Sequence, residues 1–203
     1  MTREERLSLG LHILTMLEAY ISNALWNMFY LEFKKSYEEY LKMYNGRLSS
    51  ELARKTAVEN LKVTVKSLDE TLSKVARLLK NEVGEKEIKY REFFSSGKLS
   101  DVIKGNVTDQ IVAIDYLLKA LEKNNTLMVY NMFYQTIKDL KTALEKDYKD
   151  ESDSQKAEGN AIVLLKLEES RFDFALRQIK HFVQDHVDAK EAERILKTDV
   201  YKY

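Results

Sequence analysis

The side chains best placed for chemistry lie near the C-terminal end, where Arg177, His181 and Asp185 follow one another at intervals of four residues. On an α-helix this spacing puts all three on one face. An imidazole beside a carboxylate could be oriented as a general base or could bind a metal. The alternative is a solvated helix face with ordinary charge pairs, and we expect this alternative. Arg177, His181 and Asp185 are thus weak catalytic candidates.

The sequence lacks the motifs of familiar active sites. Its six glycines are scattered, and no Gly-rich phosphate loop or Gly-x-Ser-x-Gly elbow occurs. No histidine follows a glutamate by three residues, as di-iron bundles require, and no His-Glu-x-x-His zinc motif is present. The chain has no cysteine, which removes thiolate ligands and nucleophiles. We therefore predict no cofactor and no metal site.

Two arginine–histidine pairs invite comparison with helical ribonucleases of the HEPN type, which carry an Arg-x4–6-His motif. Arg6 and His12 fit this spacing, whereas Arg177 and His181 are one residue short. Because two residues at such a spacing often occur by chance, we draw no family resemblance from them. A helical ribonuclease remains an alternative to a protein without enzymatic activity.

The charge balance bears on nucleic-acid binding. The chain has 33 basic and 33 acidic residues, so its net charge is zero, which argues against coating nucleic acid through bulk electrostatics. One aromatic stripe at helical spacing is made of Trp26, Tyr30, Phe33, Tyr37, Tyr40 and Tyr44. Such spacing predicts packing rather than base stacking. A nucleic-acid-associated subunit of a ribonucleoprotein or viral assembly remains the second alternative.

Carboxylates interrupt apolar stripes at Glu18, Glu32 and Glu169, and Asp115 lies beside the apolar Ile114. Buried carboxylates need partners, because an unpaired charge in an apolar core is costly. We expect these four at the rim of the core or paired with Lys or Arg, rather than in a catalytic pair.

Composition predicts an all-α fold. The 203 residues include no proline and only six glycines, which indicates long helices with few, short loops. Abundant Glu and Lys without cysteine is typical of thermophiles. We predict an elongated antiparallel bundle of five to seven helices, two or more of them long with coiled-coil-like heptad packing. Residues 1–203 should form one domain, divisible at 84–106 and at a polar loop over 149–155.

Local signals place the helices. The Thr2-x-x-Glu5 capping box predicts a helix start at Arg3, and a second box, Ser36-x-x-Glu39, predicts a break near Lys35. Asn45-Gly46 predicts the end of this helix. A second helix should run over 50–83, with a strict heptad at Val58, Leu61, Val65, Leu68, Leu72, Val75 and Leu79. A short helix is expected over 85–94, and a longer one from the N-cap Thr108 to 123. After a break at 124–126, the next helix should reach 149, followed by helices over 155–186 and from 189 onward. Loops are expected at 95–98 and 105–106.

The N-terminal helix is apolar on nearly every face, which raises the question of a membrane. His12, Glu18, Asn23 and Asn27 would lie in hydrocarbon, so we predict no membrane span and a cytoplasmic, intracellular protein. A second subunit would cover this helix. We expect a homodimer that acts through self-association and helix-face binding of a protein partner, with interface residues Leu11, Leu14, Ile21, Leu25, Trp26 and Tyr30.

Overall fold

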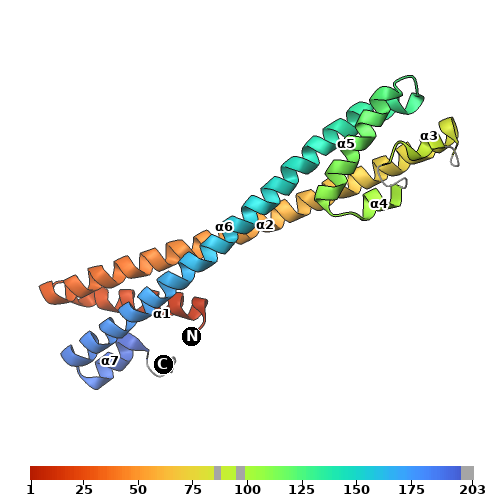
Figure 1. Cartoon of the computed structure of the whole chain (residues 1–203). Helices are drawn as coiled ribbons and strands as arrows, with labels where there is room; N and C mark the ends of the chain where they lie inside the picture. Colours follow the sequence, from red (N-terminus) through yellow and green to blue (C-terminus); the bar gives the residue numbers. More distant parts are fainter. Residues whose placement is uncertain (85–87, 95–98, 198–203) are drawn as a thin grey trace. The chain divides into compact units, whose positions relative to one another are not determined.

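The computed structural model describes residues 1–84, 88–94 and 99–197, and all regular secondary structure in these ranges is helical (Figure 1). The predicted all-α helical bundle with long helices is confirmed. In chain order the elements are α1 (Arg3–Leu17), the 3-10 helix η1 (Glu18–Tyr20), α2 (Ala24–Val83), α3 (Ile88–Arg91), α4 (Leu99–Lys104), α5 (Val107–Lys123), α6 (Met128–His186) and α7 (Ala189–Leu196). The loop expected at 95–98 lies outside the described residues.

Caps confirm two predicted helix ends and contradict a third. The Thr2 side chain accepts from the Glu5 amide at 3.2 Å, and the Thr2 amide donates to the Glu5 carboxylate at 2.6 Å, which starts α1 at Arg3. Gly84, with φ of 81°, ends α2 in the left-handed conformation. The prediction of Thr108 as N-cap is wrong: Asn106 caps α5, and its side chain accepts from the Asp109 amide at 2.9 Å.

The helix break predicted near Lys35 and the helix end predicted at Asn45-Gly46 are both wrong. Helix α2 runs without interruption past Lys35 and Gly46, and the chain turns earlier, over residues 18–23. There the Asn23 side chain accepts from the Leu25 amide at 2.9 Å and so starts α2. A single glycine costs a helix only about 1 kcal/mol relative to alanine, which the packing of neighbouring rings can outweigh.

The polar loop expected over 149–155 is also wrong, because this segment is an inner part of α6. It contains neither proline nor glycine, so nothing in it breaks a helix. Its side chains bond along the helix itself: Ser154 donates to the Glu151 carbonyl at 2.8 Å, and Lys156 lies 3.8 Å from Asp153. A polar segment that contains no proline or glycine is thus a solvated part of a helix here.

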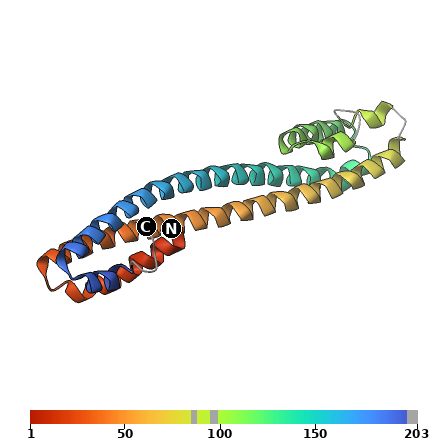
Figure 2. The ribbon, with the colours of Figure 1, turned by 90° about the horizontal axis from the view of Figure 1, so that it is seen from below.

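The chain divides into two compact units, each described by itself. Unit 1 comprises residues 1–51 and 157–203, and unit 2 comprises residues 52–156. Within unit 1, α2 and α6 are antiparallel: the rings of Trp26 and Phe182 lie 4.8 Å apart, and those of Tyr40 and Phe172 lie 5.0 Å apart (Figure 1 and Figure 2). Helix α1 folds back along α2, so that the Tyr44 hydroxyl donates to Glu4 at 2.9 Å.

The core of unit 1 is rich in aromatic rings. The buried residues that form it are Leu9, Ile13, Leu14, Leu17, Trp26, Phe33, Tyr37, Tyr40, Leu165, Phe172, Leu176, Ile179, Phe182, Val183, Ala192, Ile195 and Leu196. They come from α1, α2, α6 and α7, so helix α7 is part of the core of this unit.

Unit 2 is built around α2, α5 and α6. The Thr64 hydroxyl donates to Asp147 at 2.6 Å, and the ammonium group of Lys141 lies 2.7 Å from Asp115. Four residues of the predicted heptad stripe are buried in this core: Leu68, Leu72, Val75 and Leu79. The first three residues of the stripe, Val58, Leu61 and Val65, are half-buried. The core of unit 2 also contains the buried residues Tyr90, Phe93, Phe94, Val102, Ala113, Ile114, Leu117, Leu118, Leu121, Val129, Ile137 and Leu144.

Candidate functional site

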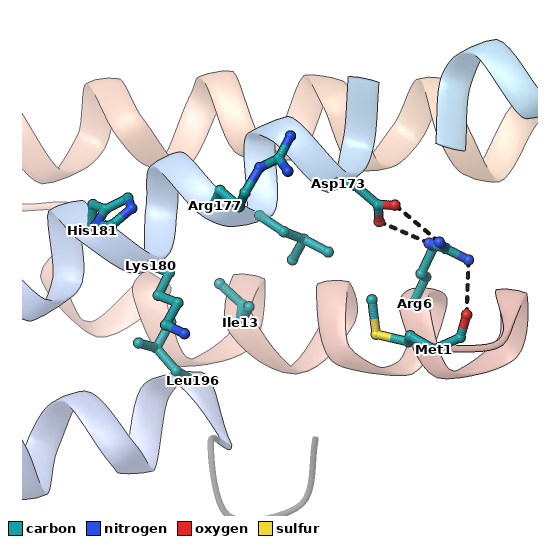
Figure 3. Close-up of a pocket in the computed structure, with 9 residues that line it drawn as sticks. Met1, Arg6, Ile13, Asp173, Arg177, Lys180, His181 and Leu196 are labelled. Atoms are coloured by element: carbon teal, nitrogen blue, oxygen red, sulfur yellow. Dashed lines mark hydrogen bonds and ion pairs between the residues drawn. The ribbon is translucent and has the colours of Figure 1, made fainter. Parts of the chain in front are cut away.

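A cavity of about 460 Å³ opens in unit 1 where α1, α6 and α7 meet (Figure 3). Ligand sites usually have volumes of this order, with apolar walls and a few polar groups. The lining side chains are Met1, Arg6, Ile13, Asp173, Leu176, Arg177, Lys180, His181 and Leu196. Helix α6 contributes five of these nine through successive turns that face α1 and α7.

The structure brings two of the three catalytic candidates to this cavity. Arg177 and His181 are exposed side chains at its wall, while Asp185 is exposed and lies outside the lining. Among the described contacts, no hydrogen bond or ion pair joins any two of these three residues. An oriented acid–base pair needs such a bond. Arg177 carries a permanent positive charge at this wall, and a catalytic role of the three candidates stays a prediction.

The other charged wall of the cavity is a fixed ion pair. The Arg6 guanidinium donates to both carboxylate oxygens of Asp173, at 2.8 and 2.9 Å, and to the Met1 carbonyl at 3.0 Å (Figure 3). The hydrogen bonds that Arg6 donates to Asp173 raise the pKa of Arg6 above its usual value. Sequence reasoning missed Asp173 and Lys180 as wall residues, because no local signal links positions on α6 to a helix 167 residues away.

The histidines lie in separate surroundings. His12 lines a shallow depression against α7, where its Nε2 atom is 3.1 Å from the Arg194 carbonyl. His186 approaches the Phe182 carbonyl within its own helix, Nδ1 to oxygen, at 2.8 Å. The Arg6 and His12 side chains thus line different cavities. Within the described parts of the chain, no three His, Asp or Glu side chains converge on a metal position.

The predicted interface residues divide into two groups. Leu14 and Trp26 are buried in the core of unit 1, where Trp26 packs on Tyr20 at 4.6 Å. Leu11, Ile21 and Leu25 are exposed, and Tyr30 is half-buried with its hydroxyl 3.4 Å from Glu18. Helix α7 and the end of α6 cover part of the N-terminal helix within the same chain, and the homodimer interface expected here stays a prediction.

Helix α6 carries an exposed apolar surface that the sequence analysis did not predict. On the α6 part of unit 1, Val163, Leu167, Ser170 and Phe174 follow 4-3-4 spacing, and we call these four residues the α6 seam. Val163 is 66%, Leu167 50% and Phe174 55% exposed, and the neighbouring Leu164 is 51% exposed. The seam lies on the side of the helix opposite its buried residues Leu165, Phe172, Leu176, Ile179 and Val183.

Two of the interrupting carboxylates are paired as expected. Glu169 bonds to Arg3, which raises the pKa of this arginine, and Asp115 pairs with Lys141. Glu18 and Glu32 are exposed, at the rim of the core. Glu169 thus ties α6 to α1 and Asp115 ties α5 to α6, while Glu18 and Glu32 face solvent.

No described helix combines the length and apolar character needed to cross a membrane. Comparison with protein-family models, with curated proteins and with solved structures finds no match for this chain.

Proposed function

We propose that this chain is a non-enzymatic helical interaction protein that associates with a second copy of itself through the α6 seam. The observation that carries the proposal is the exposure of three large apolar side chains at heptad spacing. Single exposed apolar residues are ordinary, whereas contiguous ones mark interaction surfaces. Seam residues at 4-3 spacing are what one helix presents to another in a coiled coil.

The chemistry of the seam favours a second copy as the partner. A two-fold contact places the same patch of both subunits together. All four seam residues and Leu164 are uncharged, so the contact brings no like charges together at its centre. Ser170 is small and lets the two helices approach closely between Leu167 and Phe174. A net charge of zero also removes long-range repulsion between copies.

Light scattering on the purified chain tests the proposal. At tens of micromolar, the wild type should have twice the monomer mass of 23.8 kDa. The double variant Leu167→Glu with Phe174→Glu should be monomeric, because facing carboxylates would be desolvated against each other. Circular dichroism should show that its helices persist, since both side chains point to solvent.

Two further variants locate the surface. Val112→Glu changes an equally exposed residue on α5 and should leave the dimer intact. Leu25→Glu changes the exposed part of the N-terminal face that also includes Leu11 and Ile21. A dimer that only Leu25→Glu dissociates would mean that this face is the interface and the seam is not. A wild type of 23.8 kDa at these concentrations would show self-association to be wrong.

A further inference from the structure

The sizes of the seam residues bear on how two copies can face each other. Along α6 their order is Val163, Leu167, Ser170 and Phe174, so a small residue lies between two large ones. In a parallel pair of helices each seam residue meets its own copy. In an antiparallel pair it meets the residue equally far on the other side of the two-fold axis. The two orientations therefore bring different side chains together.

A parallel pair would pack this seam poorly. Ser170 would face Ser170 and leave a gap, while Phe174 would face Phe174 one turn further on, where two rings must fit between the same two helices. The next position at heptad spacing is Arg177, an exposed residue with a permanent charge. Facing its own copy, it would bring two like charges together at the end of the contact.

An antiparallel pair whose two-fold axis crosses α6 midway along the seam fits the side chains better. Leu167 then faces Ser170 of the second copy, and Val163 faces Phe174, so each contact joins a larger side chain with a smaller one. The Ser170 hydroxyl donates to the Lys166 carbonyl of its own helix at 3.3 Å. This hydroxyl therefore needs no partner from the facing leucine. In this register the four seam residues face only one another.

The charge at the end of the seam favours the same arrangement. Arg177 then faces Asn160 of the second copy, which is uncharged and exposed. We propose that the two copies pair antiparallel, with the two-fold axis between Leu167 and Ser170, a pairing that rests on the self-association proposed above. It adds to that association the direction and the register of the two helices.

Distances between spin labels, measured by electron paramagnetic resonance, test the direction of the pair. The chain has no cysteine, so single cysteines can be introduced and labelled at Gly159 and Gln178, which lie outside the seam and equally far from the proposed axis. A Cβ atom at Gly159 meets nothing within 4 Å, and Gln178 is exposed. In an antiparallel pair, labels at the same position lie about 28 Å apart along the helices. A mixture of the two labelled variants should add a distance below about 20 Å, because paired helices lie about 8–10 Å apart.

The outcomes separate the orientation from the association itself. A distance below about 20 Å in each variant alone would overturn the antiparallel arrangement. If Leu167→Glu with Phe174→Glu still dissociated that dimer, the seam would remain the interface. A monomeric wild type by light scattering would overturn the self-association, and the orientation with it.

A charge introduced at Asn160 gives a second readout. Asn160→Glu should tighten the dimer by about two- to fivefold, because the new carboxylate faces Arg177 of the second copy, and Asn160→Lys should weaken it by about as much. Asn160→Gln is the uncharged control, and Arg177→Gln should abolish the gain from Asn160→Glu. In a parallel pair each new charge would face its own copy. Weaker dimers in both charged variants, measured by sedimentation on dilution, would therefore overturn the proposal.

Discussion

Unit 1 and unit 2 are both built on antiparallel parts of α2 and α6, yet their cores have different chemistry. In unit 1 the ring of Phe172 lies 5.0 Å from that of Tyr40 and 5.6 Å from that of Phe33. In unit 2 the buried residues of α2 and α6 are all aliphatic, with Leu68, Leu72 and Val75 along one stripe. Its buried rings belong to α3 and the residues that follow it. Branched aliphatic side chains pack well at heptad positions without a specific mutual orientation, whereas aromatic rings have preferred mutual geometries.

The ring cluster of unit 1 imposes a demand that the heptad stripe of unit 2 does not. Helix α1 passes the ring cluster at Gly10, where a Cβ atom would lie 2.6 Å from the Tyr37 ring and 2.7 Å from the Phe172 ring. The missing side chain thus makes room for two buried rings. The heptad stripe of unit 2 contains no such small residue. The lesson is that a ring-packed bundle depends on a few specific small positions.

The largest effects should come from removing one central side chain in each unit. Phe172→Ala should cost about 3–5 kcal/mol and Leu68→Ala about 2–5 kcal/mol, because each leaves a cavity at a fully buried position. Chemical denaturation followed by circular dichroism gives the free energies. A loss below about 1 kcal/mol for Leu68→Ala would mean that the stripe faces solvent.

Gly10→Ala should come next, with a loss of about 1–3 kcal/mol from overpacking. Alanine normally stabilises a helix relative to glycine, so a loss here identifies the ring contacts as the cause. Thermal and chemical denaturation measure the change. A gain in stability would show that the rings of Tyr37 and Phe172 move aside freely.

Tyr40→Phe should raise stability by about 1 kcal/mol. The Tyr40 side chain is fully buried, and its hydroxyl has no hydrogen-bond partner among the described residues. Burial raises the pKa of Tyr40 to about 12 from the usual 10. The unfolded chain therefore loses this proton first, and wild-type stability should fall as the pH rises from 10 to 12. The advantage of the phenylalanine variant should grow over that range, and an advantage that shrinks would contradict this assignment.

The smallest effects should come from the two glycines that face open space. A Cβ atom at Gly46 or Gly159 meets nothing within 4 Å, and both residues lie inside long helices. Each change to alanine should stabilise unit 1 by about 0.5–1 kcal/mol. These variants are the matched controls for Gly10→Ala. Losses at Gly46 or Gly159 would mean that backbone freedom, and not ring packing, explains the effect at Gly10.

The residues of the candidate cavity illustrate how far local patterns reach. Spacing along one helix correctly put Arg177 and His181 on a shared face, because that relation needs only the helical period. Neither residue spacing nor composition could predict which residues of α1 and α7 line the other side of the cavity. Arg6 bonds to Asp173, and Leu196 lines the cavity, only because distant helices pack together.

What the sequence by itself determined is local: the all-α class, the Thr2–Glu5 cap, the glycine stop at Gly84 and the core stripe from Leu68 to Leu79. These features follow from residues within one or two helical turns of each other. The tertiary structure alone decided that α2 passes Gly46 and that α6 passes the polar segment 149–155. It also decided that Trp26 is covered by the chain itself. The reason is energetic: a glycine or a polar stretch weakens a helix by about 1 kcal/mol or less per residue, and contacts distant in sequence outweigh so small a preference.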